Sequence, residues 1–479
     1  MKISIPRICV AATGGSGGKT LLSLGLARCW TNQGYMVKPF KKGPDYIDAA
    51  WLSAAAHQDA TNLDPFFLDA SRIRELFIHG MENAGLANRP IALIEGNRGL
   101  YDGLNETGTC STAQVARTLD SPILLCINCE KATRTIAALL AGLVSFEPGL
   151  LFAGVVLNRV GSSRHEMSLR LAIEANTDLK ILGVLPRLSP NPLPERHMGL
   201  ANGSHARDES LDGLLDNMAE LVDRHCDVRA IMECAKAAPP MQYPAARESI
   251  PPSLHTSDAR IGIVKDNALW FYYPENITAL RQQGIHTTFI TLLEDSRNNR
   301  EEWNNLDGLY LGGGFPEDYA RELASSPYLA LIREYVEADM PVYAECGGMI
   351  VLCKQLRVKD KAWPMAGIFP AEAEWCAKPQ GLGYVQAKVV CKNFYYPLGA
   401  ELLGHEFHYT RCSWQVQDFP MALELERGAG LAANAGEKAM DGAITRQTWG
   451  SWMHIFAPAV PCWAENFAKL ARDFRMKKI

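Results

Sequence analysis

Residues 8–27 read ICVAATGGSGGKTLLSLGLA: a short apolar run, a glycine-rich turn and an apolar stretch with helical spacing. A strand, a glycine loop and a helix in this order are the context of a phosphate-binding loop. Glycines let backbone N–H groups turn toward phosphate oxygens at the amino end of the helix. We predict that Gly15, Gly17 and Gly18 surround phosphates and that Lys19 neutralises their charge. A glycine-rich turn with an ordinary surface lysine is the alternative.

A magnesium ion that accompanies a nucleotide needs oxygen ligands, and the sequence offers several. The Thr20 hydroxyl directly follows the lysine of the loop. Glu95 ends an apolar run, where its carboxylate would reach the metal, and Asp45 and Asp48 lie in a turn-rich segment. The alternative for Glu95 is helix capping or a solvated carboxylate, and the alternative for the two aspartates is turn chemistry.

Residues 341–350 read PVYAECGGMI and place Cys346 between a strand-like run and a helical one. A nucleophile at such a turn is strained and exposed, and the helix amino terminus favours its thiolate form. Gly347 and Gly348 would leave backbone N–H groups free to hold an oxyanion. A thiolate nucleophile needs a base, and His454 is the best-placed late histidine. A hydrogen-bonded, semi-buried histidine is the alternative.

The other cysteines and histidines carry weaker signals. The chain has 13 cysteines, an odd number scattered through apolar segments, which fits reduced and mostly buried thiols. Cys126 and Cys129 have the spacing of a redox or metal pair, but core packing is the favoured interpretation. His405 and His408 resemble a metal pair, and a structural or substrate-contact role is favoured over metal binding.

The composition is that of an ordinary globular chain, long enough for more than one core. Of its 479 residues 47% are hydrophobic and 21% charged, and the net charge is −5. Because there is no dense run of Lys or Arg, nucleic acid and anionic membranes are not expected partners. The sequence has no signal-peptide core and no uncharged stretch near the ~20 residues that span a bilayer, so we expect a cytoplasmic protein.

Short apolar runs alternate with longer helical patterns, which predicts mostly parallel sheets with helices on both faces. The predicted strands are 8–12, 91–94, 123–127, 154–157, 181–185, 260–264, 308–311 and 341–344. Prolines and small polar residues interrupt the pattern from about residue 235. We predict a first domain over 1–234, a linker over 235–258 and a second domain over 259–479. Residues 363–423 mix short strands and turns, as an insertion or an edge meander would.

Further short motifs follow in order along almost the whole chain. They are KGPDYID (42–48), NLDP (62–65), GLYDG (99–103), STA (111–113), LNRVG (157–161), RHMGL (196–200), FYYPEN (271–276), LGGG (311–314) and GHEFHY (404–409). Together with the two turns described above, they resemble the cobyrinate a,c-diamide synthase family of glutamine-dependent tetrapyrrole amidases.

The resemblance implies an α/β protein with two domains. The first would be an ATP-dependent synthetase related to dethiobiotin synthetase, a P-loop domain on a parallel sheet, and the second a class I-like glutamine amidotransferase domain. The implied activity is that of a carbon–nitrogen ligase that uses ATP, Mg²⁺ and glutamine. ATP would convert a carboxylate to an acyl phosphate, which ammonia released from glutamine would attack. The acids would be peripheral acetates, of a and c type, on a sirohydrochlorin-derived tetrapyrrole such as cobyrinate or sirohaem.

The resemblance also implies roles for particular residues. Cys346 and His454 would release ammonia, and Asn158 would recognise adenine. Class I amidotransferases usually carry a glutamate two residues after the histidine, where this chain has Phe456, so the two would act as a dyad. The residues that would face the acid or its nucleotide are Asp45, Tyr46, Ile47, Asp48 and Asp102, with Glu95 supporting the metal.

Some residues depart from the usual cobyrinate pattern. Thr13 stands where the phosphate loop usually has glycine, and the double lysine of Lys41 and Lys42 is unusual. These features look closer to a sirohaem amidase branch of the same chemistry. The implied partners are glutamine and a carboxylated tetrapyrrole, and a homodimer is compatible with the family. The alternative function is a P-loop ATPase switch or metallocentre-assembly protein with a non-catalytic thiol domain.

Overall fold

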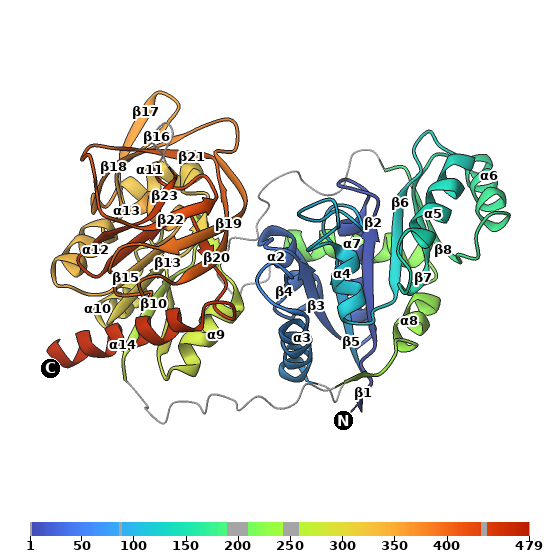
Figure 1. Ribbon diagram of the computed structural model, residues 1–479, viewed down its shortest axis with the longest axis horizontal. Helices are drawn as coiled ribbons and strands as arrows, with labels where there is room; N and C mark the ends of the chain where they lie inside the picture. Colours follow the sequence, from blue (N-terminus) through green and yellow to red (C-terminus); the bar gives the residue numbers. More distant parts are fainter. Residues whose placement is uncertain (1, 86–88, 189–208, 243–257, 433–437, 479) are drawn as a thin grey trace. The chain divides into compact units, whose positions relative to one another are not determined.

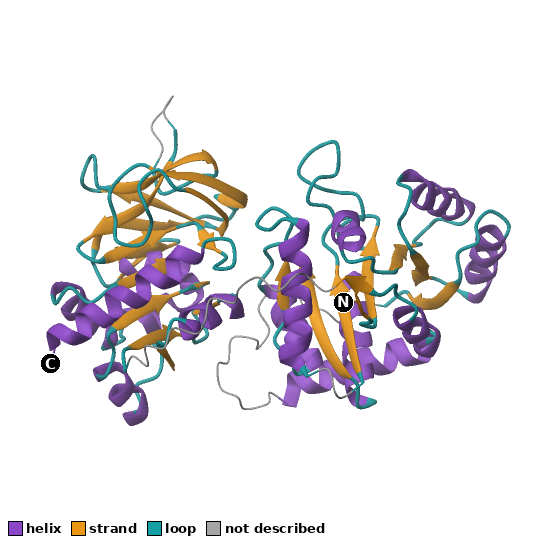
Figure 2. Ribbon diagram, turned by 60° about the horizontal axis from the view of Figure 1, so that its bottom comes forward, coloured by secondary structure: helices purple, strands orange, loops and turns teal. Residues whose placement is uncertain are grey.

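The structure is a computed structural model that describes residues 2–85, 89–188, 209–242, 258–432 and 438–478. The described residues up to 242 form one compact unit and those from 258 onward form a second (Figure 1). The RHMGL motif at 196–200 lies outside the described residues. Each unit combines a sheet with surrounding helices, as Figure 2 shows.

The first unit is built on a seven-stranded parallel sheet with the order β4-β3-β5-β2-β6-β7-β8. Its strands are β2 (Arg7–Ala12), β3 (Met36–Lys42), β4 (Thr61–Leu63), β5 (Pro90–Glu95), β6 (Ile123–Asn128), β7 (Phe152–Val160) and β8 (Ile181–Pro186). Because the strands are parallel, the carboxyl ends of the neighbours β3, β5 and β2 meet at one edge of the sheet. This edge is where α/β proteins bind their ligands.

Helices connect these strands, as parallel pairing requires. They are α1 (Lys19–Asn32), α2 (Ile47–Ala56), α3 (Ala70–Ala84), α4 (Thr112–Thr118), α5 (Arg134–Phe146), α6 (Ser163–Glu174), α7 (Glu209–His225) and α8 (Val228–Lys236). Helix α1 starts at Lys19, directly after the glycine loop, and most of its residues are buried. The fold of this unit therefore has the strand, loop and helix order that the sequence predicts.

The linker begins later than the sequence predicts. Helix α8 extends to Lys236, and β9 (Met241–Gln242) pairs with β1 (Lys2–Ile3) in a small antiparallel sheet. The Arg7 guanidinium, which is fully buried, donates a hydrogen bond of 2.6 Å to Pro239 O. Residues up to 242 therefore pack on the first unit, and the rest of the predicted linker, 243–257, lies outside the described residues.

The second unit is built on a ten-stranded sheet with the order β12-β10-β13-β15-β24-β23-β22-β19-β20-β25. Its first five strands are parallel neighbours and the others pair antiparallel. The bounds are β10 (Arg260–Val264), β12 (His286–Ile290), β13 (Gly308–Leu311), β15 (Val342–Glu345), β19 (Gly381–Val389), β20 (Glu401–His408), β22 (Met421–Arg427), β23 (Met440–Thr445), β24 (Thr448–Ser451) and β25 (His454–Ile455).

Two smaller sheets and several helices complete this unit. The strands are β11 (Leu269–Phe271) with β14 (Gly313–Gly314), and β16 (Cys353–Val358), β17 (Lys361–Pro364), β18 (Phe369–Trp375) and β21 (Thr410–Trp414). The helices are α9 (Pro274–Gln282), α10 (Arg297–Asn304), η1 (Pro316–Tyr319), α11 (Ala320–Ala324), α12 (Tyr328–Glu337), α13 (Gly347–Leu352) and α14 (Pro461–Lys478).

Residues 363–423 are more integral than an insertion or an edge meander. They supply β18 and β21 to the four-stranded sheet, and β19, β20 and the start of β22 to the main sheet. Strand β20 pairs with β25, with His405 in register with His454. Strand β20 of this segment therefore lies directly beside His454, which the sequence analysis predicts to be catalytic.

Side chains of β13 and β15 alternate between two apolar layers, as the pleat of a strand requires. Leu309, Leu311, Val342 and Ala344 enter one buried cluster, which also contains Cys346. The intervening Tyr310 and Tyr343 enter the other, where Tyr343 stacks on Trp449. Glu345 follows Ala344 and is therefore directed to the Tyr310 side of the sheet.

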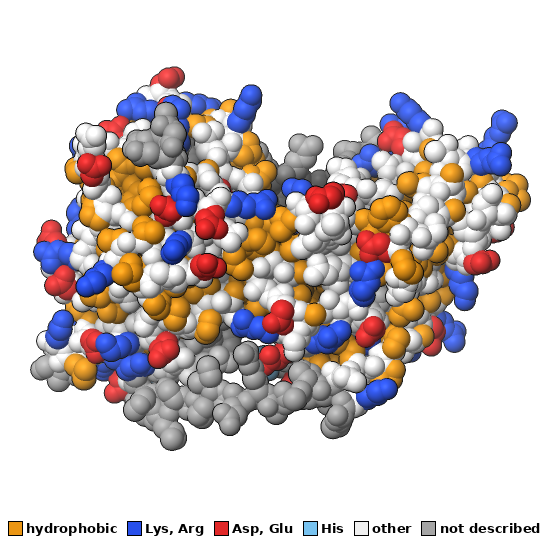
Figure 3. All heavy atoms as spheres, viewed as in Figure 1, with side chains coloured by type: hydrophobic (Ala, Val, Ile, Leu, Met, Phe, Trp, Pro, Cys, Tyr) orange, Lys and Arg blue, Asp and Glu red, His pale blue; other side chains and the backbone are white. Residues whose placement is uncertain are grey.

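Acidic and basic side chains are intermixed on the face of the molecule that Figure 3 shows. This distribution does not form a large single-sign surface there. No helix among the described residues combines the length and apolarity needed to cross a membrane.

Candidate active site

Cys346 lies at the sharp turn between β15 and α13, near the middle of the main sheet. Its φ of 48° and ψ of −104° are unusual for a residue with a side chain, and such strain marks functional positions. The Cys346 N–H donates a hydrogen bond of 2.7 Å to Ser451 O on β24, which fixes the turn. The strained turn therefore has the geometry that the sequence predicts for a nucleophile.

The environment of the thiol differs from the sequence-based expectation. Cys346 is only 1% exposed, and burial raises the pKa of its thiol above the ordinary value, with Glu317 adding to the effect. The Gly347 N–H opposes this by lowering the pKa of the thiol, but α13 is only six residues long. The neutral thiol is therefore favoured at rest, and a nucleophilic thiolate requires a base.

Two glycines allow close approach of the chain around the turn. A Cβ at Gly348 would lie 2.4 Å from Leu311 O, and one at Gly313 would lie 2.4 Å from His454 Cε1. The Gly348 N–H donates to Gly312 O at 2.9 Å, so it is not free to hold an oxyanion as the sequence suggests. The Gly347 N–H, which lies against the thiol, is the remaining candidate of the two.

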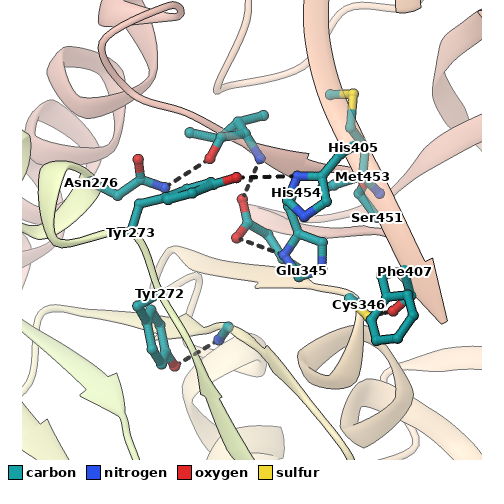
Figure 4. Close-up of polar contacts among 12 residues, drawn as sticks. Tyr272, Tyr273, Asn276, Glu345, Cys346, His405, Phe407, Ser451, Met453 and His454 are labelled. Atoms are coloured by element: carbon teal, nitrogen blue, oxygen red, sulfur yellow. Dashed lines mark hydrogen bonds and ion pairs between the residues drawn. The ribbon is translucent and has the colours of Figure 1, made fainter. Parts of the chain in front are cut away.

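His454 is fully buried and lies between two other ionisable groups (Figure 4). Its Nδ1 is 3.6 Å from Glu345 Oε2, and its ring stacks on His405 with 4.8 Å between the ring centroids. Burial, with a contribution from His454, lowers the pKa of His405 well below the ordinary value. His405 is therefore neutral and packs against His454, which agrees with the structural role favoured from sequence. His408 stacks on Trp452.

Asp441 braces the turn that leads to His454. Its Oδ1 accepts hydrogen bonds from Gly442 N at 2.8 Å and Trp452 N at 3.1 Å. Its Oδ2 accepts from Ser451 Oγ at 3.0 Å and Met453 N at 3.1 Å. Burial raises the pKa of Asp441 to about 6, against the effect of these donors. Neither Asp441 nor Glu345 was identified from sequence, although Glu345 adjoins Cys346.

The glycines of the predicted phosphate loop lie in two different environments. A Cβ at Gly14 or Gly15 would meet no atom within 4 Å, so this part of the loop faces open space. Gly18 has a φ of 96°, and a Cβ there would lie 2.1 Å from Asn158 Nδ2. Asn158 donates a hydrogen bond of 3.0 Å to Gly17 O. Its amide therefore holds the loop, and adenine recognition by Asn158 stays a prediction.

Lys19 lies over the loop with its charge directed at backbone carbonyls. Its Nζ donates to Gly14 O at 2.9 Å and to Arg98 O at 2.6 Å. Burial lowers the pKa of Lys19, and nearby Lys41 lowers it further. Phosphate oxygens could replace these carbonyls as acceptors, since the lysine of a phosphate loop needs only to pivot to reach them.

A buried charge cluster lies beside the loop. Lys41 Nζ contacts Glu95 Oε1 at 2.7 Å and Asp48 Oδ2 at 2.6 Å, and Thr20 Oγ1 donates to the same Glu95 oxygen at 3.2 Å. Burial raises the pKa of Glu95 to about 7, although Lys41 opposes the shift. Burial disfavours the Lys41 charge, but the carboxylates outweigh it and raise the pKa of the lysine. Lys41, the first residue of the double lysine, therefore supplies the counter-charge for the predicted metal ligands.

The other predicted substrate residues lie around the same edge. Asp45 accepts a hydrogen bond from Asp48 N at 2.9 Å, and burial together with Asp48 raises the pKa of Asp45 to about 6. Tyr46 is buried and precedes α2, whose first residue is Ile47. Asp102 is exposed and accepts from Gly99 N at 2.8 Å, next to the bridge between Thr13 and Gly99.

The oxygen ligands around the phosphate loop suit a nucleotide with bound Mg²⁺. Within the described ranges, no group of three or more His, Cys, Asp or Glu side chains is arranged to hold a metal ion. Mg²⁺ does not require such a cage, because it keeps several waters and binds through one or two carboxylates and the phosphates. The Thr20 hydroxyl and the Glu95 carboxylate provide suitable oxygens, and the open face at Gly15 leaves room for phosphate.

Cys126 and Cys129 are fully buried, and Cys126 Sγ contacts Gly17 O at 3.4 Å. Burial raises the pKa of both thiols to about 12. Their contacts are those of packing residues beneath the loop, the interpretation favoured from sequence.

Comparison with known proteins defines the class of each unit. Residues 8–200 match the CobQ/CobB/MinD/ParA nucleotide binding domain, and residues 260–460 match the CobB/CobQ-like glutamine amidotransferase domain. The chain thus joins a nucleotide-binding domain to a glutamine amidotransferase domain, both of α/β architecture.

Full-length relatives identify the family. Cobyrinate a,c-diamide synthase of Magnetococcus marinus is 34% identical over 99% of this chain and 98% of that protein. The enzyme of the same name from Archaeoglobus fulgidus is 35% identical over 98% of each chain. The chain belongs to the cobyrinate a,c-diamide synthase family, and it is a ligase with a glutamine amidotransferase domain.

Proposed function

We propose that this ligase uses ATP, Mg²⁺ and glutamine to amidate peripheral acetates of a sirohydrochlorin-derived tetrapyrrole. The observation that carries the proposal is the pairing of two sites in one chain. One is a phosphate loop beside the Glu95 cluster, and the other is the strained Cys346 beside buried His454. We assign activation of the acid to the unit that ends at residue 242 and ammonia release to residues 259–479.

The thiol site is suited to release ammonia from an amide. Cys346 Sγ attacks the side-chain carbonyl carbon of glutamine, and His454 takes the thiol proton and then gives it to the departing nitrogen. A thioester remains, which water hydrolyses to glutamate. Burial disfavours the charged thiolate of Cys346. Because the proton moves to His454 only during attack, the resting enzyme does not have to bury a thiolate.

The nucleotide site is suited to activate a carboxylate, which resists amines because it is an anion with a poor leaving group. ATP supplies the phosphoryl group, and Mg²⁺ supplies charge neutralisation at the phosphates. Lys19 and the loop N–H groups hold the phosphates, and Thr20 and Glu95 hold the metal. Asp45, Tyr46, Ile47, Asp48 and Asp102 line the approach of the acid. Ammonia then displaces phosphate from the activated acid to form the amide.

The names of the relatives favour cobyrinate as the acid, with its a and c acetates as the positions amidated. The double lysine that pointed to the sirohaem branch has a different explanation, since Lys41 pairs with Glu95 and Asp48. Sirohaem is therefore the second candidate substrate, to be tested beside cobyrinate.

Mass spectrometry of the products tests the proposal. The protein is incubated with ATP, Mg²⁺ and glutamine together with cobyrinate, sirohaem or nickel-sirohydrochlorin. With ordinary glutamine, each amidation replaces a hydroxyl by an amino group and lowers the mass by about one unit. With ¹⁵N-amide glutamine, each new amide is about one unit heavier than its ¹⁴N counterpart, so the mass difference between the two products counts the nitrogens added. Two labelled nitrogens on cobyrinate are expected. No labelled product from any ring, with ATP hydrolysis that needs no tetrapyrrole, would instead support an ATPase switch.

A further inference from the structure

The carboxylate beside His454 comes from Glu345 and not from the position that Phe456 occupies. The position two residues after His454, where class I amidotransferases usually have glutamate, is occupied by Phe456, which is buried against the ring of Tyr273. A carboxylate is nevertheless present, because Glu345 approaches His454 from a neighbouring strand. The acid is thus supplied by the residue that directly precedes the nucleophile.

Three contacts hold the Glu345 carboxylate in place. Oε1 accepts a hydrogen bond of 3.1 Å from the Ile455 N–H, and Oε2 accepts one of 2.9 Å from the Tyr310 hydroxyl. The same Oε2 lies 3.6 Å from His454 Nδ1. The side chain is fully buried, and Figure 4 shows its carboxylate directed toward His454. A buried carboxylate with this many donors is fixed in direction.

The Cε1 and Nε2 edge of the imidazole lies against β14, the strand that borders the nucleophile turn. A Cβ at Gly313 would lie 2.4 Å from His454 Cε1 and 3.1 Å from Nε2, so this edge of the ring lies against β14. A Cβ at Gly347, the residue after Cys346, would lie 2.9 Å from Gly314 N on the same strand. Nδ1 therefore faces Glu345 while the Nε2 edge faces the strand that borders Cys346.

We propose that Glu345 is a positioning residue that replaces the missing glutamate and makes a Cys346, His454 and Glu345 triad. The inference rests on the proposed release of ammonia from glutamine. Glu345 holds the proton of neutral His454 on Nδ1, so that Nε2 is the nitrogen that accepts a proton during catalysis. A carboxylate that orients an imidazole in this way also stabilises the imidazolium that forms during catalysis.

The proton balance is complete without another reactant. As Sγ forms a bond to the amide carbon, the Cys346 proton moves to His454 Nε2, and it is delivered to the nitrogen when the C–N bond breaks. Water then attacks the thioester, and the released thiolate recovers a proton through His454. Glu345 stays beside Nδ1 throughout and takes no part in the proton transfer.

Two ionisable groups from neighbouring strands contact His454. They are Glu345 of β15 and His405 of β20, with the Tyr310 hydroxyl behind Glu345. Replacing Glu345 by glutamine removes a carboxylate 3.6 Å from His454 Nδ1, so the acid side of the pH profile for glutamine hydrolysis should move to lower pH.

The test compares Glu345→Gln, Glu345→Asp and Tyr310→Phe in the full-length protein. Glu345→Gln should lower kcat for glutamate release by about 10²-fold with KM for glutamine nearly unchanged, because orientation of the base is lost rather than substrate binding. The acid side of its pH profile should move downward. Glu345→Asp, which keeps the charge, should recover about tenfold of the loss. Tyr310→Phe removes one hydrogen bond but no charge and should cost no more than about threefold.

Amidation with ammonium chloride separates this inference from the function on which it rests. Glu345→Gln should keep wild-type rates with ammonia, which also shows that the variant is folded. Equal kcat of Glu345→Gln and wild type, or equal impairment of the Gln and Asp variants without a pH shift, would overturn the positioning role. Failure of the wild type itself to release glutamate would overturn the proposed function.

Discussion

The two candidate sites solve the problem of buried charge in different ways. At the thiol site, the nucleophile is neutral at rest because burial raises the pKa of Cys346, and its turn is fixed by backbone contacts to β24. At the nucleotide site, a lysine and two carboxyl groups are buried together, and Lys41 contacts both Glu95 and Asp48. The thiol site becomes charged only during the reaction, whereas the nucleotide site holds its carboxyl groups beside a buried lysine at rest.

The difference fits the ligands that we propose for the two sites. For glutamine, a strained thiol with a nearby base is sufficient. For a magnesium nucleotide, carboxylates are needed before binding, and an uncompensated buried charge costs several kcal/mol. Lys41 removes that cost, and it also competes with an incoming cation for Glu95. We expect the thiol site to remain rigid when glutamine binds. At the nucleotide site, we expect Glu95 to exchange its contact with Lys41 for one with the incoming cation.

The largest expected effect separates the two sites completely. Cys346→Ser should lower glutamate release by at least about 10³-fold, because the hydroxyl is a far poorer nucleophile beside His454. Amidation with ammonia should continue at the wild-type rate. The check is a pair of assays, glutamate release and the difference in product mass between ¹⁴N- and ¹⁵N-ammonium. Loss of both activities would show that the two sites do not divide the reaction as proposed.

Removal of the Lys41 charge should destabilise the buried cluster that it forms with Glu95 and Asp48. Lys41→Met leaves Glu95 and Asp48 without their shared counter-charge and should lower the free energy of unfolding by about 3–5 kcal/mol. Mg²⁺ should raise the unfolding temperature of this variant more than that of the wild type. Scanning calorimetry with and without Mg²⁺ measures both effects.

Lys42→Met is the matched control for the cluster. Lys42 is the next residue of β3 and is also buried, but its principal acidic neighbour is Asp64. Its loss should give no added response to Mg²⁺. If the Lys41 and Lys42 variants respond equally to the cation, Lys41 has no special relation to the metal ligands.

Lys19→Ala should show the opposite selectivity to the cysteine variant. Removal of one cation at the transferring phosphate should lower ATP-dependent amidation by about 10²–10³-fold with either nitrogen source. Basal glutamate release should remain. An unchanged amidation rate would contradict the assignment of residues 13–20 as the phosphate loop.

The smallest effect concerns the brace of the thiol site. The pKa of Asp441 is raised to about 6 in the folded protein from 3.8, so its contribution to stability is greatest below pH 4 and is lost as the pH rises through about 6. Relative to Asp441→Asn, which does not titrate, the wild type should lose up to about 3 kcal/mol between pH 4 and pH 7. Urea unfolding at both pH values measures the difference. A pH-independent difference would show that Asp441 is already ionised at pH 4.

Much of the fold was predictable because its signals are local. The apolar runs at 8–12 and 123–127 lie within β2 and β6, and 341–344 overlaps β15. Strand β3 was missed because it contains three lysines and a proline, which read as polar surface. In the structure Lys38, Lys41 and Lys42 are all buried, because carboxylates or carbonyls meet them. A pattern of hydrophobicity cannot identify a strand whose buried residues are charged.

The sequence by itself determined the local chemistry: a glycine loop that ends in Lys19, and a cysteine between a strand and a helix. These depend on residues adjacent in the chain, so spacing is sufficient to find them. Only the tertiary structure decided that Lys41 neutralises Glu95, 54 residues away, and that Glu345 meets the backbone of Ile455, 110 residues away. The physical reason is that strand order and register, set by burial over the whole domain, determine which distant charges share a buried site.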